Sequence, residues 1–376
     1  MRVLQVLGSS AGGVARHVAQ ITRALAEPGL DPESAQADTV HVAGPPDLAA
    51  VVAPPDAAAV FHATPIADRP RPADVQAVRR LRALASGADV VHAHGLRAGA
   101  LAVLAVRTLP SRSRPRVVVT LHNLPVGGRA IRAVSTVLER VVARGADVVL
   151  GVSGDLVALA RARGARQAQR ALVPAPPLPE PGRDRAAVRS ALGLAADDPL
   201  VVSVARLAPQ KGLGLLADAA ARLSEASGQR GLLWAVAGDG PLRGELQARI
   251  DAERLPVRLL GRREDVADLM AAADVVASTA VWEGQPIAVQ EALQLGAPLV
   301  ATDAGGTREV TGDAAVLVSV GDADGLARAL GEVLGDTSRR AALAAASRAQ
   351  AATLPGVADV VAQLRAAYRG RTSSRD

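Results

Sequence analysis

The sequence has no cysteine, almost no aromatic residues and a single lysine. The absence of cysteine excludes disulfides, thiolate nucleophiles and Cys-ligated zinc. With two Trp, one Tyr and one Phe in 376 residues, the hydrophobic cores have to be built from Ala, Val and Leu. Because single-stranded nucleic acid is bound largely by stacking its bases on aromatic rings, we do not expect nucleic acid as a partner.

The chain also lacks a long apolar run. Ala98–Val106 is among its longest uncharged apolar stretches, whereas a membrane-spanning helix needs ~20 such residues. The apolar run that follows Arg2 is about five residues long, shorter than the roughly 7–15 residues in the core of a secretory signal peptide. We therefore expect a cytoplasmic protein that makes at most peripheral contact with the inner face of the cell membrane.

Positive charge is concentrated in the first half of the chain. Residues 1–180 hold 21 Arg against 13 Asp and Glu, a net charge of +8, while residues 181–376 carry −2. Arginines cluster at Arg79, Arg80 and Arg82 and again over Arg107–Arg116. This pattern predicts a partner that is anionic or held at an anionic membrane surface. A plain solvated face is an equal alternative in so arginine-rich a chain.

Both halves alternate apolar runs with amphipathic helical stretches, the pattern of βαβ units. We predict two α/β, Rossmann-like, doubly wound parallel-sheet domains facing a central cleft, with ligands at the carboxyl ends of the strands. The predicted strands are Arg2–Leu7, Asp89–His92, Arg116–Leu121, Asp147–Val152, Leu200–Val204, Leu232–Ala237, Val257–Leu260, Val275–Ser278 and Pro298–Ala301. The predicted helices include Val14–Ala26, Val75–Ala85, Arg129–Ala143, Gly212–Leu223, Leu242–Glu253, Pro286–Leu295 and Val357–Tyr368.

A proline-rich segment predicts the domain boundary. Residues 174–182 contain five prolines, which exclude a helix or a sheet interior and favour an extended connector. We predict a first domain at residues 1–173, a linker at 174–182 and a second domain at 183–353. The C-terminal helix, residues 355–369, is expected to complete the first domain.

Two cations mark a turn in the second half. Arg206 and Lys211 lie in Ser203–Gly212, which follows a predicted strand and leads into a helix. At the carboxyl end of a strand, before a helix whose dipole favours anions, both are placed to bind negative charge. Because all other basic residues are Arg, the lysine indicates that a compact point charge is required. A chance lysine on a solvated turn is the alternative.

Two glutamates bracket the next motif. Glu283 precedes a predicted helix and Glu291 lies more than a turn inside it. Gly284 lets a ligand approach the backbone, and Pro286 suits the first turn of the helix. Carboxylates at this spacing can accept hydrogen bonds from two hydroxyl-bearing rings, although paired surface glutamates at this distance are common.

Together these motifs resemble the retaining glycosyltransferases of the GT-B fold, family 4, also called glycosyl transferases group 1. The motifs are Arg-x4-Lys-Gly at 206–212, Gly-Asp-Gly-Pro at 238–241, Glu-x7-Glu at 283–291 and Gly-Gly-x-x-Glu at 305–309, in the family's order. The resemblance implies that Arg206 and Lys211 neutralise the leaving diphosphate. It also implies that Glu283 faces the transferred sugar and that Glu291 holds the ribose hydroxyls. The other implied donor-binding residues are glycines: Gly12, Gly13, Gly238, Gly284, and Gly305 and Gly306 through their backbone N–H groups.

The first half is similar to the family more loosely. Its matches are Gly12–His17, Asp89–Gly95 and Thr120–Asn123. They imply that His94 reaches the sugar or its developing oxocarbenium ion, and they make His17, His122 and Asn123 candidates for sugar or acceptor contact. His92 is better explained as a structural histidine. The family often has Pro-Asn-Gly after the last strand of the first domain, where this chain has Pro174-Ala175-Pro176.

Metal and dinucleotide sites are weaker interpretations. His92 and His94 share one strand face, but no third ligand follows at a suitable spacing. Asp322-Ala-Asp324 imitates a metal-binding Asp-x-Asp, yet an aspartate before a helix is the natural N-cap. The turn at 238–240 does not complete Gly-x-Gly-x-x-Gly. We therefore expect no metal and no cofactor besides a nucleotide-diphosphate sugar as co-substrate.

The resemblance implies a retaining, metal-independent hexosyltransferase-type enzyme of glycan biosynthesis, with the acceptor in the first domain and the donor in the second. No carboxylate in the first half stands out as a base for inverting attack, which favours attack from the front face assisted by the departing phosphate. Two alternatives stay open. A nucleotide-sugar 2-epimerase of the same fold would need acid/base carboxylates in the first domain, and a non-catalytic GT-B subunit would bind sugar or nucleotide without turnover.

Overall fold

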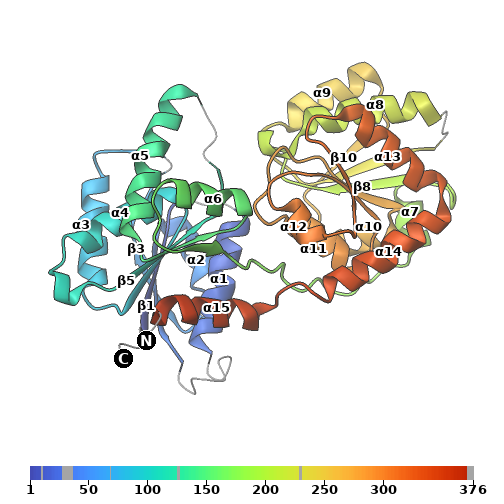
Figure 1. Ribbon diagram of the computed structural model, residues 1–376. Coiled ribbons are helices and arrows are strands. Elements are labelled where there is room, and N and C mark those ends of the chain that lie inside the picture. Colours follow the sequence, from blue (N-terminus) through green and yellow to red (C-terminus); the bar gives the residue numbers. More distant parts are fainter. Residues whose placement is uncertain (10–11, 28–36, 68, 125–127, 228–230, 371–376) are drawn as a thin grey trace. The chain divides into compact units, whose positions relative to one another are not determined.

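The computed structural model describes all residues except 10–11, 28–36, 68, 125–127, 228–230 and 371–376. The chain divides into two compact units, Met1–Pro174 with Pro355–Asp376, and Ala175–Leu354. The C-terminal residues thus belong to the first unit. Each unit is an α/β domain built on one parallel sheet (Figure 1), which confirms the predicted pair of doubly wound domains.

The first unit is built on a seven-stranded parallel sheet with the order β3-β2-β1-β4-β5-β6-β7. Helices α3, α4 and α5 pack side by side on one face, and α1 packs against α2 and α15 (Figure 1). Its strands are β1 (Arg2–Leu7), β2 (Thr39–Gly44), β3 (Ala59–Ala63), β4 (Val90–His94), β5 (Arg116–Leu121), β6 (Val148–Gly151) and β7 (Ala168–Arg170). Its α-helices are α1 (Gly13–Ala26), α2 (Ala49–Val52), α3 (Asp74–Ala85), α4 (Leu96–Arg107), α5 (Arg129–Gly145), α6 (Gly154–Ala162) and α15 (Val357–Arg369).

The second unit has a six-stranded parallel sheet with the order β10-β9-β8-β11-β12-β13. One core packs this sheet against α8, α9 and α13, and a second core packs it against α7, α10, α11 and α14. The strands are β8 (Leu200–Val204), β9 (Leu233–Ala237), β10 (Val257–Gly261), β11 (Val275–Ser278), β12 (Leu299–Thr302) and β13 (Val316–Val318). The α-helices are α7 (Arg185–Ala191), α8 (Leu213–Ser227), α9 (Arg243–Glu253), α10 (Val266–Ala272), α11 (Ile287–Gln294), α12 (Thr307–Thr311), α13 (Ala323–Gly335) and α14 (Thr337–Ala351).

Small aliphatic residues fill both cores, as the composition predicts. β4 and β9 are buried along their whole length, which fits strands covered by helices on both faces. Trp234 is the bulkiest fully buried side chain. Its indole N–H donates to the Ser203 hydroxyl over 2.9 Å, so the one polar atom that this large ring brings into the core is satisfied.

The nine predicted strands are present, with ends shifted by two residues at most. Four strands were not predicted: β2, β3, β7 and β13. Three of these are edge strands, and β7 and β13 have three residues each. A strand of three residues is too short to stand out as an apolar run, and the runs of β2 and β3 are interrupted by His41 and His62.

The proline-rich segment is part of the second unit rather than a free connector. The chain crosses between the units after Pro174. The Ala175 N–H donates to the Gln290 side-chain carbonyl over 2.9 Å, and the Gly182 N–H donates to Asp268 over 2.7 Å. Both ends of residues 175–182 are therefore anchored to the second unit.

Helix α15 is fixed to the first unit by buried polar contacts. Arg365 forms an ion pair with Asp38 at 3.4 Å, and Asp38 also accepts from the Met1 ammonium group at 2.9 Å. Both side chains of the Arg365–Asp38 pair are at most 4% exposed. The Gln363 amide bonds Leu172 and Arg170. The C-terminal helix therefore packs within the first unit.

Candidate functional site

The strand order of the second unit reverses between β8 and β11. β8 leads to β9 on one side of the sheet, while β11 leads to β12 on the other. At such a reversal the two following loops diverge and leave room for a ligand beyond the carboxyl ends of the strands. Lys211 ends the loop after β8, and Glu283 lies in the loop after β11. Residues 72 positions apart are therefore brought to one point of the sheet edge.

Lys211 and Glu283 form an ion pair through the ammonium group and one carboxylate oxygen. Their side chains are 21% and 15% exposed, respectively. This exposure leaves the pair within reach of a ligand while removing much of the surrounding water, which strengthens electrostatic interactions. The structure thus brings together two of the predicted catalytic residues of this unit.

Two glycines let the loops around this pair approach one another. Gly212 has φ +63, and a Cβ there would lie 1.9 Å from the Thr279 carbonyl oxygen. Gly305 has φ +56, and its Cβ would lie 2.0 Å from the Glu283 carbonyl oxygen. Thr279 in turn donates its hydroxyl to the Lys211 carbonyl over 2.8 Å. The loops after β8, β11 and β12 are therefore joined by direct backbone contact.

The double-glycine turn holds the backbone of Glu283. The Gly306 N–H donates to the Glu283 carbonyl over 2.8 Å, so the N–H that the resemblance assigned to the donor is engaged within the protein. Gly238 approaches Ala205 in the same way as the other glycines, with a Cβ position 1.9 Å from the Ala205 carbonyl oxygen. The glycines of the motif therefore shape the loops, whatever contacts a donor makes with them.

The remaining predicted donor-side residues occupy the same loops and the helix that follows them. Arg206 is exposed immediately after β8, Gly284 is buried beside Glu283, and Glu291 is half-buried on α11. Asp322 accepts a hydrogen bond from the Gly325 N–H at the start of α13, so the helix-cap interpretation of Asp322-Ala-Asp324 is confirmed. Within the described ranges, no group of three or more His, Asp or Glu residues is arranged to hold a metal ion.

In the first unit the strand order reverses between β1 and β4, and His94 ends β4 at this point. Its ring lies against those of His17, on α1, and His122, after β5, with centroid distances of 6.2 and 5.5 Å. The three histidines that the sequence marked separately therefore form one cluster at the carboxyl ends of the strands. The side chains of all three are buried or nearly so.

Burial keeps these histidines neutral. It lowers the pKa of His17 to about 4 and that of the adjacent His92 to about 3. Burial also holds the pKa values of His94 and His122 well below the usual range, and the neighbouring histidines lower them further. A neutral imidazole donates at one nitrogen and accepts at the other, so the cluster offers directional hydrogen bonding rather than positive charge.

Polar partners of the cluster were not predicted. The His94 Nε2 lies 2.7 Å from the Gln5 side-chain oxygen, and the His92 ring bonds Tyr368 and Thr120, each at 2.7 Å. Gln5 interrupts the apolar run of β1, a signal the sequence did contain. Tyr368 is the chain's single tyrosine, but its partner is 276 positions away, which no local pattern could reveal.

The other predicted residues of this unit lie at the surface. Gly12, with φ +93, caps the start of α1, and a Cβ on Gly12 or Gly13 would meet nothing within 4 Å. Asn123 is exposed directly after His122. Gly12, Gly13 and Asn123 are thus all exposed.

Comparisons with known proteins agree with this geometry. Residues 12–176 match the model of the glycosyl transferase 4-like domain, and residues 184–350 match that of the glycosyl transferases group 1. The chain belongs to the group 1 glycosyltransferases and has the GT-B fold. The Anabaena protein Alr3699/HepE, solved in complex with UDP-glucose, is similar over 97% of this chain and 98% of its own, with 22% identity and a TM-score of 0.77.

Two curated relatives are each 34% identical to this chain. One is a Corynebacterium glutamicum GDP-mannose-dependent monoacylated alpha-(1-6)-phosphatidylinositol monomannoside mannosyltransferase, matched over 181 residues, or 46% of this chain and 47% of the relative. The other is a D-inositol 3-phosphate glycosyltransferase of Xylanimonas cellulosilytica, matched over 225 residues, or 56% and 54%. The chain thus spans about half the length of the curated relatives it matches.

We expect Gly305→Ala to destabilise the protein by about 1–3 kcal/mol or more, because an L residue at this φ is strained and its Cβ would collide with the Glu283 carbonyl. Urea denaturation measures the change. Gly331→Ala, inside α13 and with its nearest heavy atom at an ordinary 3.6 Å, is the matched control and should stabilise by ~0.5–1 kcal/mol. Equal stability of the two variants would contradict the close approach.

Proposed function

We propose that this protein is a retaining, metal-independent glycosyltransferase that moves a sugar from a nucleotide-diphosphate donor to an acceptor hydroxyl. The observation that carries the proposal is the Lys211–Glu283 pair at the strand-order reversal of the second unit. Family membership supports it, and so does the fold shared with a protein crystallised with UDP-glucose. The donor would bind the loops after β8, β11 and β12.

In this proposal the positive side chains stabilise the leaving group. Arg206 is exposed and Lys211 is partly exposed on the loop after β8, where a diphosphate can approach both. As the sugar–phosphate bond breaks, charge grows on the phosphate oxygens, and cations already in place stabilise it without reorganisation. Glu283 keeps Lys211 in position before the donor arrives and faces the sugar once the donor is bound. The acceptor hydroxyl attacks from the same face, and the departing phosphate takes its proton.

The epimerase alternative would need acid/base carboxylates in the part of the first unit that the structure describes, and the buried acidic side chains there are engaged elsewhere. The two acidic side chains buried there are Asp38 and Glu139. Asp38 is paired with Arg365 and the N-terminus, and Glu139 is paired with Arg163. Both carboxylates therefore form ion pairs that stabilise the fold. A non-catalytic subunit would show donor binding without turnover, which the assay below separates from transfer.

Replacing either cation should lower turnover strongly. We expect Lys211→Ala and Arg206→Ala each to reduce kcat by about two to three orders of magnitude, equivalent to ~3–4 kcal/mol of transition-state stabilisation. Donor hydrolysis over a panel of nucleotide sugars gives kcat, and thermal unfolding reports Tm. Arg339→Ala, which removes an exposed ion pair with Glu332, is the control and should keep full activity. Wild-type kcat in a folded Lys211→Ala variant would contradict the proposed role of Lys211 in stabilising the leaving group.

Turnover should survive in chelator. We expect the same rate with EDTA as with added magnesium or manganese, since arginine and lysine supply the positive charge at the diphosphate. The product anomer, read by proton NMR in the same reactions, should match the configuration of the donor. A metal requirement that is restored by adding the ion back would contradict metal independence, and an inverted product would contradict retention.

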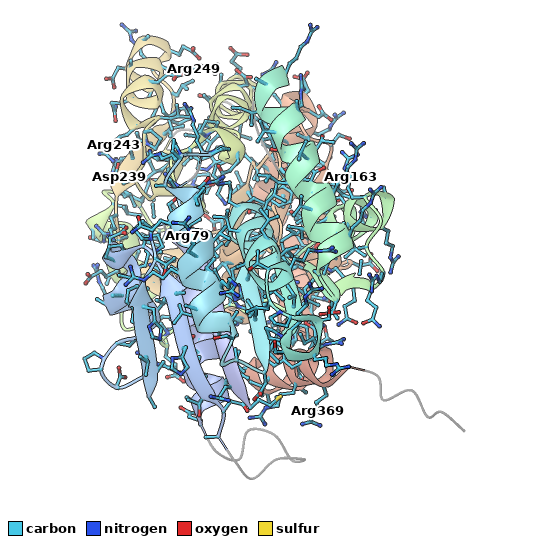
Figure 2. The ribbon with its side chains drawn as sticks, turned by 90° about the vertical axis from the view of Figure 1, so that its left-hand side faces the viewer. Arg79, Arg163, Asp239, Arg243, Arg249 and Arg369 are labelled. Atoms are coloured by element: carbon cyan, nitrogen blue, oxygen red, sulfur yellow. The ribbon has the colours of Figure 1, made fainter. Side chains whose placement is uncertain are left out.

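We also propose that the first unit meets an anionic acceptor or an anionic membrane surface. Arg79, Arg80 and Arg82 are exposed on α3, and Figure 2 shows Arg79 pointing outward from that helix. In contrast, Arg107 and Arg114 donate to backbone carbonyls of their own domain, so the second basic cluster has a structural use. Among the described residues, no helix is both long enough and apolar enough to cross a membrane.

Helix α5, separated from α3 by α4, carries an exposed apolar surface (Figure 1). Ile131, Val134 and Val137 are 45%, 43% and 58% exposed on its first turns. Positions 131, 134 and 137 are spaced by three and share one side of the helix, while Arg129 and Arg132 flank them. An apolar stripe bordered by arginine is typical of a helix that lies in the plane of a membrane interface.

Vesicle sedimentation tests this attachment. We expect binding to anionic but not to neutral vesicles, lost by ~0.5 M salt because exposed charges are then screened. Each arginine near a charged bilayer contributes about 1 kcal/mol, so Arg79/Arg80/Arg82→Ala should weaken binding by about two orders of magnitude. The control removes three exposed arginines of the second unit, Arg254, Arg262 and Arg328. Equal recovery in the supernatant under all conditions would reject the membrane surface.

A further inference from the structure

Six side chains of the first unit form a continuous hydrogen-bonded chain. Their atoms are joined as His122 Nε2 to His94 Nδ1 at 3.2 Å, His94 Nε2 to Gln5 Oε1 at 2.7 Å, Gln5 Nε2 to Tyr368 Oη at 3.5 Å, Tyr368 Oη to His92 Nδ1 at 2.7 Å, and His92 Nε2 to Thr120 Oγ1 at 2.7 Å. All six are buried. They come from β1, β4, β5 with the residue after it, and α15.

Gln5 fixes the direction of this chain. Its amide oxygen can only accept and its amide nitrogen can only donate. Because Oε1 faces His94, the His94 proton is on Nε2. The bare Nδ1 of His94 must then accept from His122, which places the His122 proton on Nε2 as well.

The other half of the chain continues in the same direction. The Gln5 amide donates to the Tyr368 oxygen, so the Tyr368 proton is free to bond the His92 Nδ1. His92 then carries its proton on Nε2 and donates it to Thr120. One donor meets one acceptor at every link, and all three histidines are neutral Nε2–H tautomers.

Neutrality is required for this order to hold. A protonated imidazole would donate from both nitrogens and would break one of its two links. Burial keeps the pKa of His92 near 3 and those of His94 and His122 well below the usual range. Burial also raises the pKa of the Tyr368 hydroxyl, so the phenol keeps the proton that the chain needs.

We propose that Tyr368 on the C-terminal helix is a positioning residue that sets the tautomers of His94 and His122. The His122 Nδ1 is left as a bare acceptor, and no hydrogen bond to it occurs within the described residues. This nitrogen lies beside the exposed Asn123 after β5, at the end of the sheet where a hydroxyl of the substrate would arrive. The catalytic consequence rests on the proposed glycosyl transfer, whereas the tautomer assignment does not.

The test combines histidine NMR with kinetics on the full chain. In 15N-histidine-labelled wild-type protein at neutral pH, the long-range proton–nitrogen spectrum should show His94 and His122 as Nε2–H tautomers. In Tyr368→Phe, which keeps the ring but removes the hydroxyl, Gln5 loses the acceptor that holds its orientation. We expect mixed tautomers for both histidines and a kcat lowered by at least about tenfold, with the donor KM changed less, since a wrong tautomer impairs catalysis more than binding.

Thr22→Val is the matched control. Thr22 is fully buried on α1 of the same unit, so its hydroxyl is lost from the core without touching the chain of six. This variant should keep wild-type tautomers and kcat. Because the Thr22 hydroxyl has no hydrogen-bond partner among the described residues, its removal should cost little stability. Tm measured for both variants then separates a general loss of stability in Tyr368→Phe from a loss of catalysis alone.

Each outcome bears on one claim. Nδ1–H tautomers in the wild type would overturn the proposed direction even if Tyr368→Phe does not fold. Wild-type tautomers together with wild-type kcat in Tyr368→Phe would overturn the role of Tyr368 and leave glycosyl transfer intact. No transfer by the wild type, with the Nε2–H tautomers and their dependence on Tyr368 as expected, would refute the proposed function and leave the positioning chain standing.

Discussion

The site of each domain depends on the point where the order of its parallel strands reverses. Between β8 and β11, and again between β1 and β4, neighbouring strands lead to connections on opposite sides of the sheet. The loops beyond those strands therefore separate, and side chains distant in sequence meet at the opening. Lys211 and Glu283 are placed by the first reversal, and His94 is placed by the second.

The sequence was sufficient to predict the two sheets and most residues at their functional edge. Strands such as β5 and β8 are short and rich in valine, and their ends were predicted correctly because polar residues follow within two positions, His122 after β5 and Arg206 after β8. Gly212 and Gly305 could be recognised as motif glycines. The reason why these two positions require glycine is a carbonyl oxygen within 2.0 Å of where a Cβ would lie, and this close approach could be seen only in the structure. Of the unpredicted strands, β7 and β13 are only three residues long, and β2 and β3 are interrupted by histidine, so none gives a long apolar run.

Contacts made across long sequence separations could not be predicted. The Arg365–Asp38 pair joins residues 327 positions apart and the Tyr368–His92 bond joins residues 276 apart, and neither has a local signal. The proline-rich segment shows the same limit. Its composition correctly excluded a helix or strand, but its attachment to Asp268 and Gln290 depends on polar partners supplied by another part of the chain. The local sequence pattern determines which helices and strands form, whereas the contacts that fix them to one another depend on how the whole chain packs.

The two domains stabilise the polar side chains at their sheet edges in different ways. Lys211 and Glu283 keep some solvent exposure and can remain charged, because each has an opposite charge beside it. His92, His94 and His122 of the first domain are buried, and among the described residues none of them bonds a carboxylate, so a positive charge there would be unpaired and costly. They remain neutral and gain order from one another and from Gln5 and Tyr368. Under the proposed reaction, stabilisation of the leaving diphosphate falls to the second domain. Directional bonding to a substrate hydroxyl falls to the first, because a neutral imidazole of fixed tautomer can accept such a bond and an imidazolium cannot.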